Sequence, residues 1–205
     1  MGTIVASRQI FTGVILAGGA ASRMGGQDKG LIALNGRPLI EYVLAALTPQ
    51  VGQVLINANR NQAIYARYGH SVIQDEFDGY CGPLAGMASC LHAVTTPVMV
   101  TAPCDSPFVP GDLVTRLYQK MQQDDAEISV AHNGERLQPV FTMMQNTVLD
   151  SLLDFLHRGE RKIDKWFELH KVAVVDFSGQ PDTFLNINTR EELALVEARL
   201  MEAAR

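Results

Sequence analysis

The sequence has few cysteines, no long hydrophobic run and no excess of basic residues, and each absence excludes a class of protein. Its 205 residues include three cysteines, Cys81, Cys90 and Cys104, which form no C-x-x-C pair. This pattern excludes a zinc ribbon or a disulfide scaffold and indicates reduced thiols. No apolar run approaches the ~18 residues of a membrane helix. The segment that best imitates a signal sequence, residues 11–21, is short and ends in glycine and alanine. We therefore expect a cytoplasmic protein without membrane contact.

The charge balance is mildly acidic. The chain has 17 Lys and Arg residues against 22 Asp and Glu residues, which gives a formal net charge of −5. Such a balance disfavours binding to a nucleic-acid backbone, so we expect no nucleic-acid partner. The hydrophobic fraction of 47% and the charged fraction of 19% are typical of a globular protein. The length suits one domain over residues 1–205, and we expect a monomer.

Short apolar runs alternate with amphipathic stretches along the chain. This alternation predicts an α/β protein with a single Rossmann-like, doubly wound, mainly parallel (mixed) sheet and helices on both faces. Ligands of such sheets bind beyond the carboxyl ends of the strands. The expected strands are Thr12–Ala17, Val51–Ala58, Ser71–Gln74, Pro97–Ala102, Glu127–Ala131, Pro139–Met143, Val172–Phe177 and Phe184–Ile187. The expected helices are Pro38–Leu47, Gln62–Tyr68, Gly82–Val94, Pro110–Gln123, Asn146–His157, Lys162–His170 and Arg190–Ala203, the last with a capping box formed by Thr189 and Glu192.

A glycine-rich loop, Gly18–Gly30, follows the first expected strand and contains Arg23 and Lys29. Glycines let the backbone approach a ligand closely, successive N–H groups can surround phosphate oxygens, and the two cations add charge. Two better-known motifs do not match. The P-loop needs Ser or Thr after its lysine, and the dinucleotide motif needs G-x-G-x-x-G spacing. The segment predicts a phosphate-binding loop of another kind.

Acidic and amide side chains follow several expected strands. Asp105 ends the turn after Pro97–Ala102, where a carboxylate faces the ligand crevice and suits Mg²⁺; a turn aspartate is the alternative. Asp75 follows a short strand and suits the edge of a base or a ribose hydroxyl, or is an exposed loop acid. Asn186 and Asn188 would share one face of a strand, or serve a turn or a cap.

Cys104 is interpreted as a small buried thiol. The five histidines have no ligand spacing and are interpreted as surface or helix residues, and Trp166 as packing.

The motif L-A-G-G-x-x-x-R-M-G-G-x-D-K-G-L at residues 16–31 resembles the opening of nucleotidyltransferases, and most closely that of the MobA-type molybdenum cofactor guanylyltransferase family. Four further segments resemble that family in the same order, so the resemblance extends over nearly the whole chain. They are residues 56–60 (INANR), 82–86 (GPLAG), 103–107 (PCDSP) and 186–189 (NINT).

The resemblance implies transfer of GMP from GTP, with Mg²⁺, to the phosphate of molybdopterin or the molybdenum cofactor, with release of pyrophosphate. It implies a nucleotide-binding half at about residues 10–110 and an acceptor half at 111–205. Cofactor-delivery proteins and molybdoenzyme-specific chaperones are the implied transient partners. The implied catalytic residues are Lys29, Arg23 and Asp105, with Asp105 also as metal ligand. The implied nucleotide-binding residues are Leu16, Ala17, Gly18, Gly19, Lys29, Asn57, Asp75 and Asp105, and the acceptor-binding residues are Gly26, Gly82, Asn186 and Asn188.

Three other functions remain open from the residues alone. A cytidylyl- or uridylyltransferase acting on a sugar or alditol phosphate would use a similar loop, because glycines do not identify the base. A non-catalytic GTP-binding regulator would not need Lys29, Arg23 and Asp105 together. An NAD(P)-dependent oxidoreductase is disfavoured by the missing dinucleotide spacing.

Overall fold

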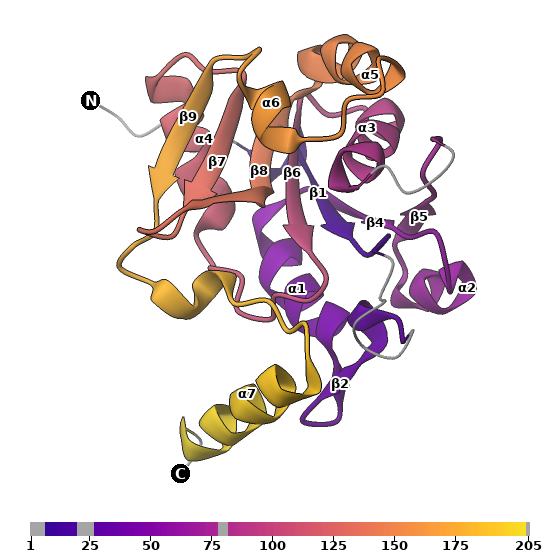
Figure 1. Ribbon diagram of the computed structural model, residues 1–205, viewed down its shortest axis with the longest axis vertical. Coiled ribbons are helices and arrows are strands. Elements are labelled where there is room, and N and C mark those ends of the chain that lie inside the picture. Colours follow the sequence, from indigo (N-terminus) through magenta and orange to yellow (C-terminus); the bar gives the residue numbers. More distant parts are fainter. Residues whose placement is uncertain (1–6, 20–26, 78–81, 204–205) are drawn as a thin grey trace.

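The computed structural model describes residues 7–19, 27–77 and 82–203. A seven-stranded sheet with helices on both faces forms its centre (Figure 1). In spatial order, its strands are β5 (Ser71–Ile73), β4 (Gln53–Asn57), β1 (Phe11–Leu16), β6 (Val98–Pro103), β8 (Leu137–Gln145), β7 (Ile128–His132) and β9 (Val172–Asp176). Strands β5, β4, β1 and β6 are parallel, whereas β8 is antiparallel to both of its neighbours. The predicted α/β fold with a mainly parallel, mixed sheet is confirmed.

Helices on the two faces of the sheet bury separate hydrophobic clusters. One cluster contains side chains of α1 (Leu39–Leu47) and α4 (Leu113–Gln123), and the other those of α3 (Pro83–Ala93), α5 (Leu149–His157) and α6 (Ile163–Phe167). Alternate residues of β1 serve both clusters, since Ile15 lies in the first and Val14 in the second. This explains why the strand is a continuous apolar run without polar alternation.

The strand order reverses direction at β1. The chain passes from β1 to β4 and β5 on one side and then places β6 on the other side of β1. Leu16 is in register with both Asn57 and Pro103, so the carboxyl ends of these three parallel strands lie side by side. A reversal of this kind opens a crevice for ligands beyond the strand ends. Gly18 and Gly19, the first residues of the predicted loop, and Asp105 follow these strand ends.

A third hydrophobic cluster joins the segment around residues 32–39 to the C-terminal segment. The hairpin of β2 (Ala33–Leu34) and β3 (Arg37–Pro38) turns at Asn35 and Gly36, whose φ values of +50° and +77° suit an Asn-Gly turn. Val196 of α7 (Arg190–Ala203) packs with Leu34 and Ile187. Helix α7 therefore lies beside β2 and apart from the central sheet (Figure 1).

The expected strand at Phe184–Ile187 is wrong. Residues Pro181–Phe184 form a 3₁₀ helix, and the following residues run as irregular chain. The ring of Phe184 lies 4.7 Å from that of Phe141 and 5.3 Å from that of Phe177, both in edge contacts. The apolar side chains of this segment therefore fill a corner of the core and do not mark a strand.

The interpretation of His170 as a surface or helix residue is also wrong. Its side chain is only 7% exposed, because its ring packs edge-on against Trp166 at 5.0 Å. Its two ring nitrogens contact Glu127 at 3.1 Å and the Ser151 hydroxyl at 2.8 Å. His170 thus links Glu127, the residue before β7, to Ser151 of α5, and Trp166 packs as predicted.

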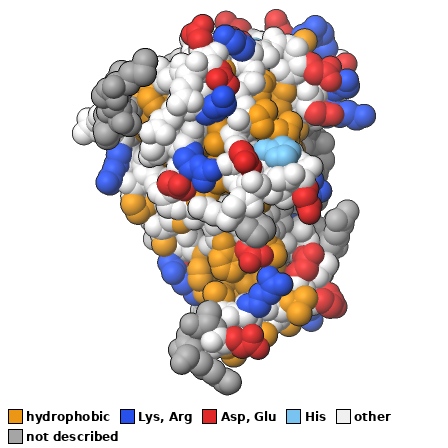
Figure 2. All heavy atoms as spheres, turned by 90° about the vertical axis from the view of Figure 1, so that its left-hand side faces the viewer, with side chains coloured by type: hydrophobic (Ala, Val, Ile, Leu, Met, Phe, Trp, Pro, Cys, Tyr) orange, Lys and Arg blue, Asp and Glu red, His pale blue; other side chains and the backbone are white. Residues whose placement is uncertain are grey.

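On the face drawn in Figure 2, the two signs of charge are mixed. Figure 2 shows Lys and Arg side chains interspersed with Asp and Glu side chains on the face that lies at the left of Figure 1. Among the described helices, none has the length and apolar character needed to cross a membrane.

Candidate active site

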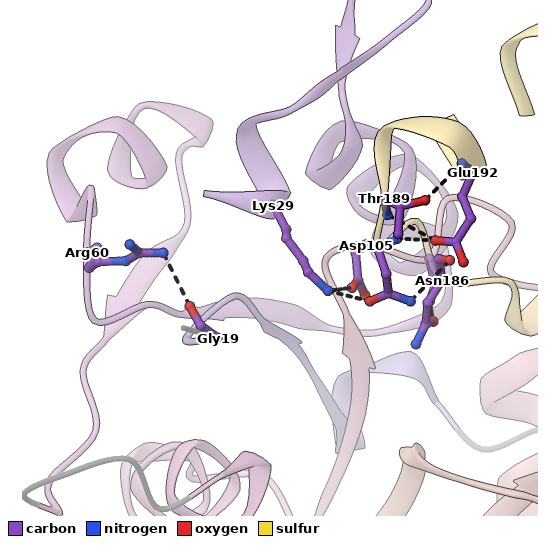
Figure 3. Close-up of polar contacts among 9 residues, drawn as sticks. Gly19, Lys29, Arg60, Asp105, Asn186, Thr189 and Glu192 are labelled. Carbon is purple, nitrogen blue, oxygen red and sulfur yellow. Dashed lines mark hydrogen bonds and ion pairs between the residues drawn. The ribbon is translucent and has the colours of Figure 1, made fainter. Parts of the chain in front are cut away.

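Lys29, Asp105 and Asn188 meet beyond the carboxyl ends of β1 and β6. The Lys29 ammonium lies 2.9 Å from Asp105 Oδ2 and also donates to Asn188 Oδ1 (Figure 3). The side chains of Lys29 and Asp105 are 24% and 10% exposed, so the ion pair is largely withdrawn from solvent. An ion pair in such a place interacts more strongly than one at the surface. The structure thereby brings together three predicted site residues from distant parts of the chain.

One backbone hydrogen bond and one side-chain hydrogen bond hold the segment that carries Asn186 and Asn188 against residues 105 and 106. The Ile187 N–H donates to the Asp105 carbonyl oxygen at 2.9 Å, and the Ser106 hydroxyl donates to Asn186 Oδ1. These two asparagines lie on irregular chain, so the expectation that they share one face of a strand is wrong. Hydrogen bonds to the loop after β6 place them at the site instead.

A capping box fixes the start of α7 next to this segment. The Glu192 N–H donates to Thr189 Oγ1 at 3.1 Å, and Glu192 Oε2 accepts from the backbone N–H of Thr189 at 3.1 Å (Figure 3). The same carboxylate oxygen accepts from the Asn188 N–H at 2.6 Å. The predicted capping box is confirmed, and it also orients Asn188.

A second polar cluster lies at the end of β4. Asn57, which is 2% exposed, donates from Nδ2 to Asp75 Oδ1 at 2.8 Å. Asn59 donates to Asp75 Oδ2 at 2.8 Å, and its Oδ1 accepts from the Asp75 N–H at 2.9 Å. The carboxylate of Asp75 is therefore held by two amides. Asn59 was not identified as a site residue from the sequence. The Asn-x-Asn spacing of residues 57–59 was the available signal, because residues two apart on extended chain point to the same face.

The first residues of the glycine-rich loop lie between the two clusters. Ala17 N–H donates to the Asn57 carbonyl at 2.8 Å, and Leu16 O accepts from the Cys104 N–H at 3.1 Å. A Cβ atom on Gly18 would lie 3.0 Å from Asn57 Oδ1, so a side chain there would crowd the amide. The Gly19 carbonyl accepts from Arg60 at 3.3 Å (Figure 3).

The remaining predicted residues divide into two groups. Gly82 precedes α3 with φ of +70°, a conformation that favours glycine. Arg23 and Gly26 lie outside the described residues. The structure therefore gives a position for Gly82, whereas the predictions for Arg23 and Gly26 stay predictions.

A metal ion at this site would have Asp105 as its protein ligand. Within residues 7–19, 27–77 and 82–203, no group of three or more His, Cys, Asp or Glu side chains is arranged to hold a metal. A single carboxylate nevertheless suits Mg²⁺, which commonly combines one or two carboxylates with phosphate oxygens and water. Asp105 thus fits a magnesium ion that arrives with a phosphate ligand.

The thiol of Cys104 lies next to this carboxylate but is buried, as predicted. Burial raises the pKa of Cys104, and the neighbouring carboxylates of Asp105 and Asp28 raise it further. The thiol therefore stays protonated at neutral pH and is a poor nucleophile. Its role is packing beneath the site.

Solved structures of similar fold include nucleotidyltransferases. "Molybdopterin-guanine dinucleotide biosynthesis protein A" from Archaeoglobus fulgidus superposes with a TM-score of 0.79 at 26% identity, covering 93% of this chain and 99% of that one. A 4-diphosphocytidyl-2C-methyl-D-erythritol synthase from Anaerococcus prevotii gives a TM-score of 0.74 over 95% of this chain and 97% of its own, at 12% identity, and shows a shared fold only.

Sequence relatives are closer. A molybdenum cofactor guanylyltransferase from Shewanella sediminis is 48% identical over 179 residues, covering 87% of this chain and 91% of its own length. One from Shewanella sp. strain MR-4 is 46% identical over 190 residues, covering 93% and 96%. The family model described as the MobA-like NTP transferase domain matches residues 13–174. The chain therefore belongs to the family of the MobA-like NTP transferase domain.

Proposed function

We propose that the protein transfers GMP from GTP to the phosphate of molybdopterin or the molybdenum cofactor and releases pyrophosphate. Relatives at 46–48% identity over most of the chain carry the name molybdenum cofactor guanylyltransferase. The observation that carries the proposal is the contact of Lys29 with Asp105 and Asn188 at the reversal of the strand order. There, one cation, one carboxylate and one amide converge where α/β sheets bind nucleotides.

In the proposed reaction, the phosphate of the acceptor attacks the α-phosphorus of GTP in line with the leaving pyrophosphate. A phosphate monoester has a second pKa of about 6, so the attacking group is already largely dianionic at neutral pH. The protein then needs no general base, and its task is positioning and charge stabilisation. The bond from the α-phosphorus to the acceptor oxygen forms as the bond to pyrophosphate breaks.

Each part of the site has a proposed role in that reaction. The loop that begins at Gly18 and Gly19 binds phosphate with backbone N–H groups, and Lys29 and Arg23 neutralise phosphate charge. When bound, Mg²⁺ supplies electrostatic stabilisation of the phosphates, with Asp105 as its ligand.

The acceptor-binding residues are proposed to include Gly26, Gly82, Asn186 and Asn188. Support comes from the bond between Lys29 and Asn188, which joins the proposed nucleotide half at about residues 10–110 to the proposed acceptor half at 111–205. A lysine that touches both halves is well placed for a transfer between two phosphates. The proposed location is the cytoplasm, supported by the free, buried thiols of Cys90 and Cys104.

Guanine is the expected base. We propose that Asn57 and Asp75 contact the nucleotide. Buried polar groups that are matched to one base lose hydrogen-bond partners when a different base binds, so the site discriminates against that base. Pyrophosphate release should therefore be measured with purified protein, Mg²⁺ and molybdopterin for GTP, CTP, ATP and UTP in parallel. We expect turnover with GTP and at least ~10-fold lower kcat/KM with the other nucleotides. Equal use of CTP would contradict guanine selectivity, and CTP turnover with a sugar phosphate would favour the cytidylyltransferase alternative.

Gly86→Ala should weaken GTP binding although residue 86 is not expected to touch the nucleotide. A Cβ atom there would lie 2.3 Å from Asn57 Oδ1 and 2.8 Å from its Cγ, so the amide that donates to Asp75 must shift. Crowding of a packed side chain typically costs about 1–3 kcal/mol. Titration calorimetry with GTP is the measurement, and Gly111→Ala, where a Cβ meets nothing within 4 Å, is the matched control. Unchanged GTP affinity in Gly86→Ala would show that the position of Asn57 does not matter for binding.

A further inference from the structure

A buried carboxylate immediately precedes the site lysine. Asp28 is 8% exposed, and both of its carboxylate oxygens have partners. Tyr65, at the end of α2 (Gln62–Tyr65), donates its hydroxyl to Oδ1, and Asn61 donates Nδ2 to Oδ2 at 3.1 Å. Asp28 thus connects the loop after β1 with the segment after β4.

The backbone around Lys29 depends on this connection. The Leu31 N–H donates to the Asp28 carbonyl at 3.0 Å, and the Ile32 N–H to that of Lys29 at 3.2 Å, so Asp28 is the first residue of the short 3₁₀ turn that carries the lysine. A Cβ atom on Gly30 would lie 2.7 Å from the Tyr65 hydroxyl. The turn therefore packs directly on the hydroxyl.

The Tyr65 hydroxyl is a permanent donor. Its residue is fully buried in the core beside α1, and burial raises the pKa of Tyr65 far above its usual value, with Cys104 and Asp28 adding to the effect. The phenol stays protonated, and a carboxylate oxygen of Asp28 accepts its hydrogen bond. Hydrogen bonds to carboxylates are among the stronger ones in proteins, so this bond ties Asp28 to the core at Tyr65.

We infer that Tyr65, through Asp28, is a positioning residue for Lys29 in the transfer reaction. The inference rests on the proposed function, in which Lys29 acts on phosphate. The lysine side chain is long and has many rotamers, whereas its Cα position is set by the 28–31 turn. Fixing that turn from the core lets the ammonium leave Asp105 and Asn188 and reach a phosphate without reordering the backbone.

A positioning role predicts a particular kinetic signature. Ground-state binding of GTP spreads over many contacts and tolerates a small displacement of Lys29. Charge stabilisation in the transition state does not, because misplacement by about 1 Å can cost ~10²-fold in rate. Loss of the Tyr65 hydroxyl should therefore lower kcat more than it raises KM.

The test is Tyr65→Phe combined with Lys29→Ala in a double-mutant cycle. We expect Tyr65→Phe to lower kcat by about 10-fold while KM for GTP changes less than about twofold. In the Lys29→Ala background the same substitution should change kcat by less than about twofold, because the residue through which Tyr65 acts is gone. An effect of Tyr65→Phe that is equal in both backgrounds would overturn the inference.

Two further variants keep the test decisive. Tyr42→Phe removes a hydroxyl that donates to the Leu34 carbonyl at 2.8 Å in the hairpin, and it should leave kcat at the parent value. Asn61→Gly removes the other side-chain partner of Asp28. Residue 61 has φ of +52°, which glycine adopts without strain. This variant should also lower kcat, and it replaces Tyr65→Phe in the test if Tyr65→Phe does not fold. If neither Tyr65→Phe nor Asn61→Gly affects kcat, the inference is wrong. If the parent protein itself transfers no GMP, the proposed function has failed instead.

Discussion

Lys29→Ala is expected to reduce GMP transfer by about 10²–10³-fold, which corresponds to ~3–4 kcal/mol of transition-state stabilisation. The ammonium is the described cation nearest to the proposed metal ligand, 2.9 Å from Asp105 Oδ2. Charge that develops on the transferred phosphate and on the leaving pyrophosphate needs a positive partner in a site with little water. Initial rates of pyrophosphate release at saturating GTP measure the loss.

The structure also predicts a cost in stability for this variant. From the sequence, a loop lysine should contribute little to folding. In the fold, however, Lys29 neutralises a carboxylate that is only 10% exposed, so its removal leaves Asp105 partly buried without its ion-pair partner. We expect the free energy of unfolding to fall by about 1–3 kcal/mol. Urea titration of the parent and the variant provides the measurement.

A matched lysine separates the two effects. Lys120 lies 2.9 Å from Asp124 at the end of α4, the same separation as in the Lys29 pair, but its side chain and that of Asp124 are more exposed, at 38% and 37%. Lys120→Ala should leave the rate of transfer and the stability near the parent values, as is usual for exposed ion pairs. A folded Lys29→Ala variant that turns over normally would exclude a role for Lys29 at the phosphates.

The meeting of Lys29 with Asp105 was predictable from the sequence for a general reason. Both residues follow buried apolar runs, and parallel strands put the residues after them at the same edge of the sheet. The apolar runs themselves were clear because β1 and β6 are covered on both faces, so no polar alternation interrupts them. For these elements, local pattern and tertiary environment agree.

The contacts made by the C-terminal segment were not predictable in the same way. Asn188 reaches Lys29 from 159 positions away along irregular chain, and no periodicity encodes that approach. The apolar residues of Phe184–Ile187 favour a strand. Instead, the ring of Phe184 packs edge-on against Phe141, and Ile187 packs in the cluster that contains Val196 of α7. Tertiary packing decided between two local structures that the sequence permits equally.

The link between Asp28 and Tyr65 shows a further limit of sequence patterns. Asp28 belongs to the glycine-rich motif, where a carboxylate between a glutamine and a lysine has the sequence context of an exposed residue. The two partners of its carboxylate include a tyrosine 37 positions later, at the end of α2. A buried charge needs partners, and those partners become visible only when the two loops are placed side by side.

Asp105→Asn should separate metal-dependent transfer from nucleotide binding. The substitution nearly keeps the shape of the side chain, and the bond from the Ile187 N–H survives because it goes to the backbone carbonyl of residue 105. The charge that holds Lys29 and would hold Mg²⁺ is lost. We expect the rate of transfer to fall by about 10²-fold or more, whereas GTP affinity falls only modestly, since the glycine-rich loop and Lys29 still bind phosphate.

Magnesium dependence gives this prediction its decisive readout. Raising the Mg²⁺ concentration should recover part of the rate of Asp105→Asn, because an amide oxygen remains a weak metal ligand. Asp124→Asn is the control, since it removes the carboxylate of the Lys120 ion pair on α4, away from the site, and should not alter the magnesium dependence. If Asp105→Asn turned over like the parent at low Mg²⁺, Asp105 would not be the metal ligand.

Asp28 and Asp75 would then be the next carboxylates to test. Each of them already accepts two side-chain hydrogen bonds, so a metal would have to displace those donors. Asp105 instead has the Lys29 ammonium as its side-chain partner, and movement of that lysine to a phosphate would leave the carboxylate open to the cation that arrives with it.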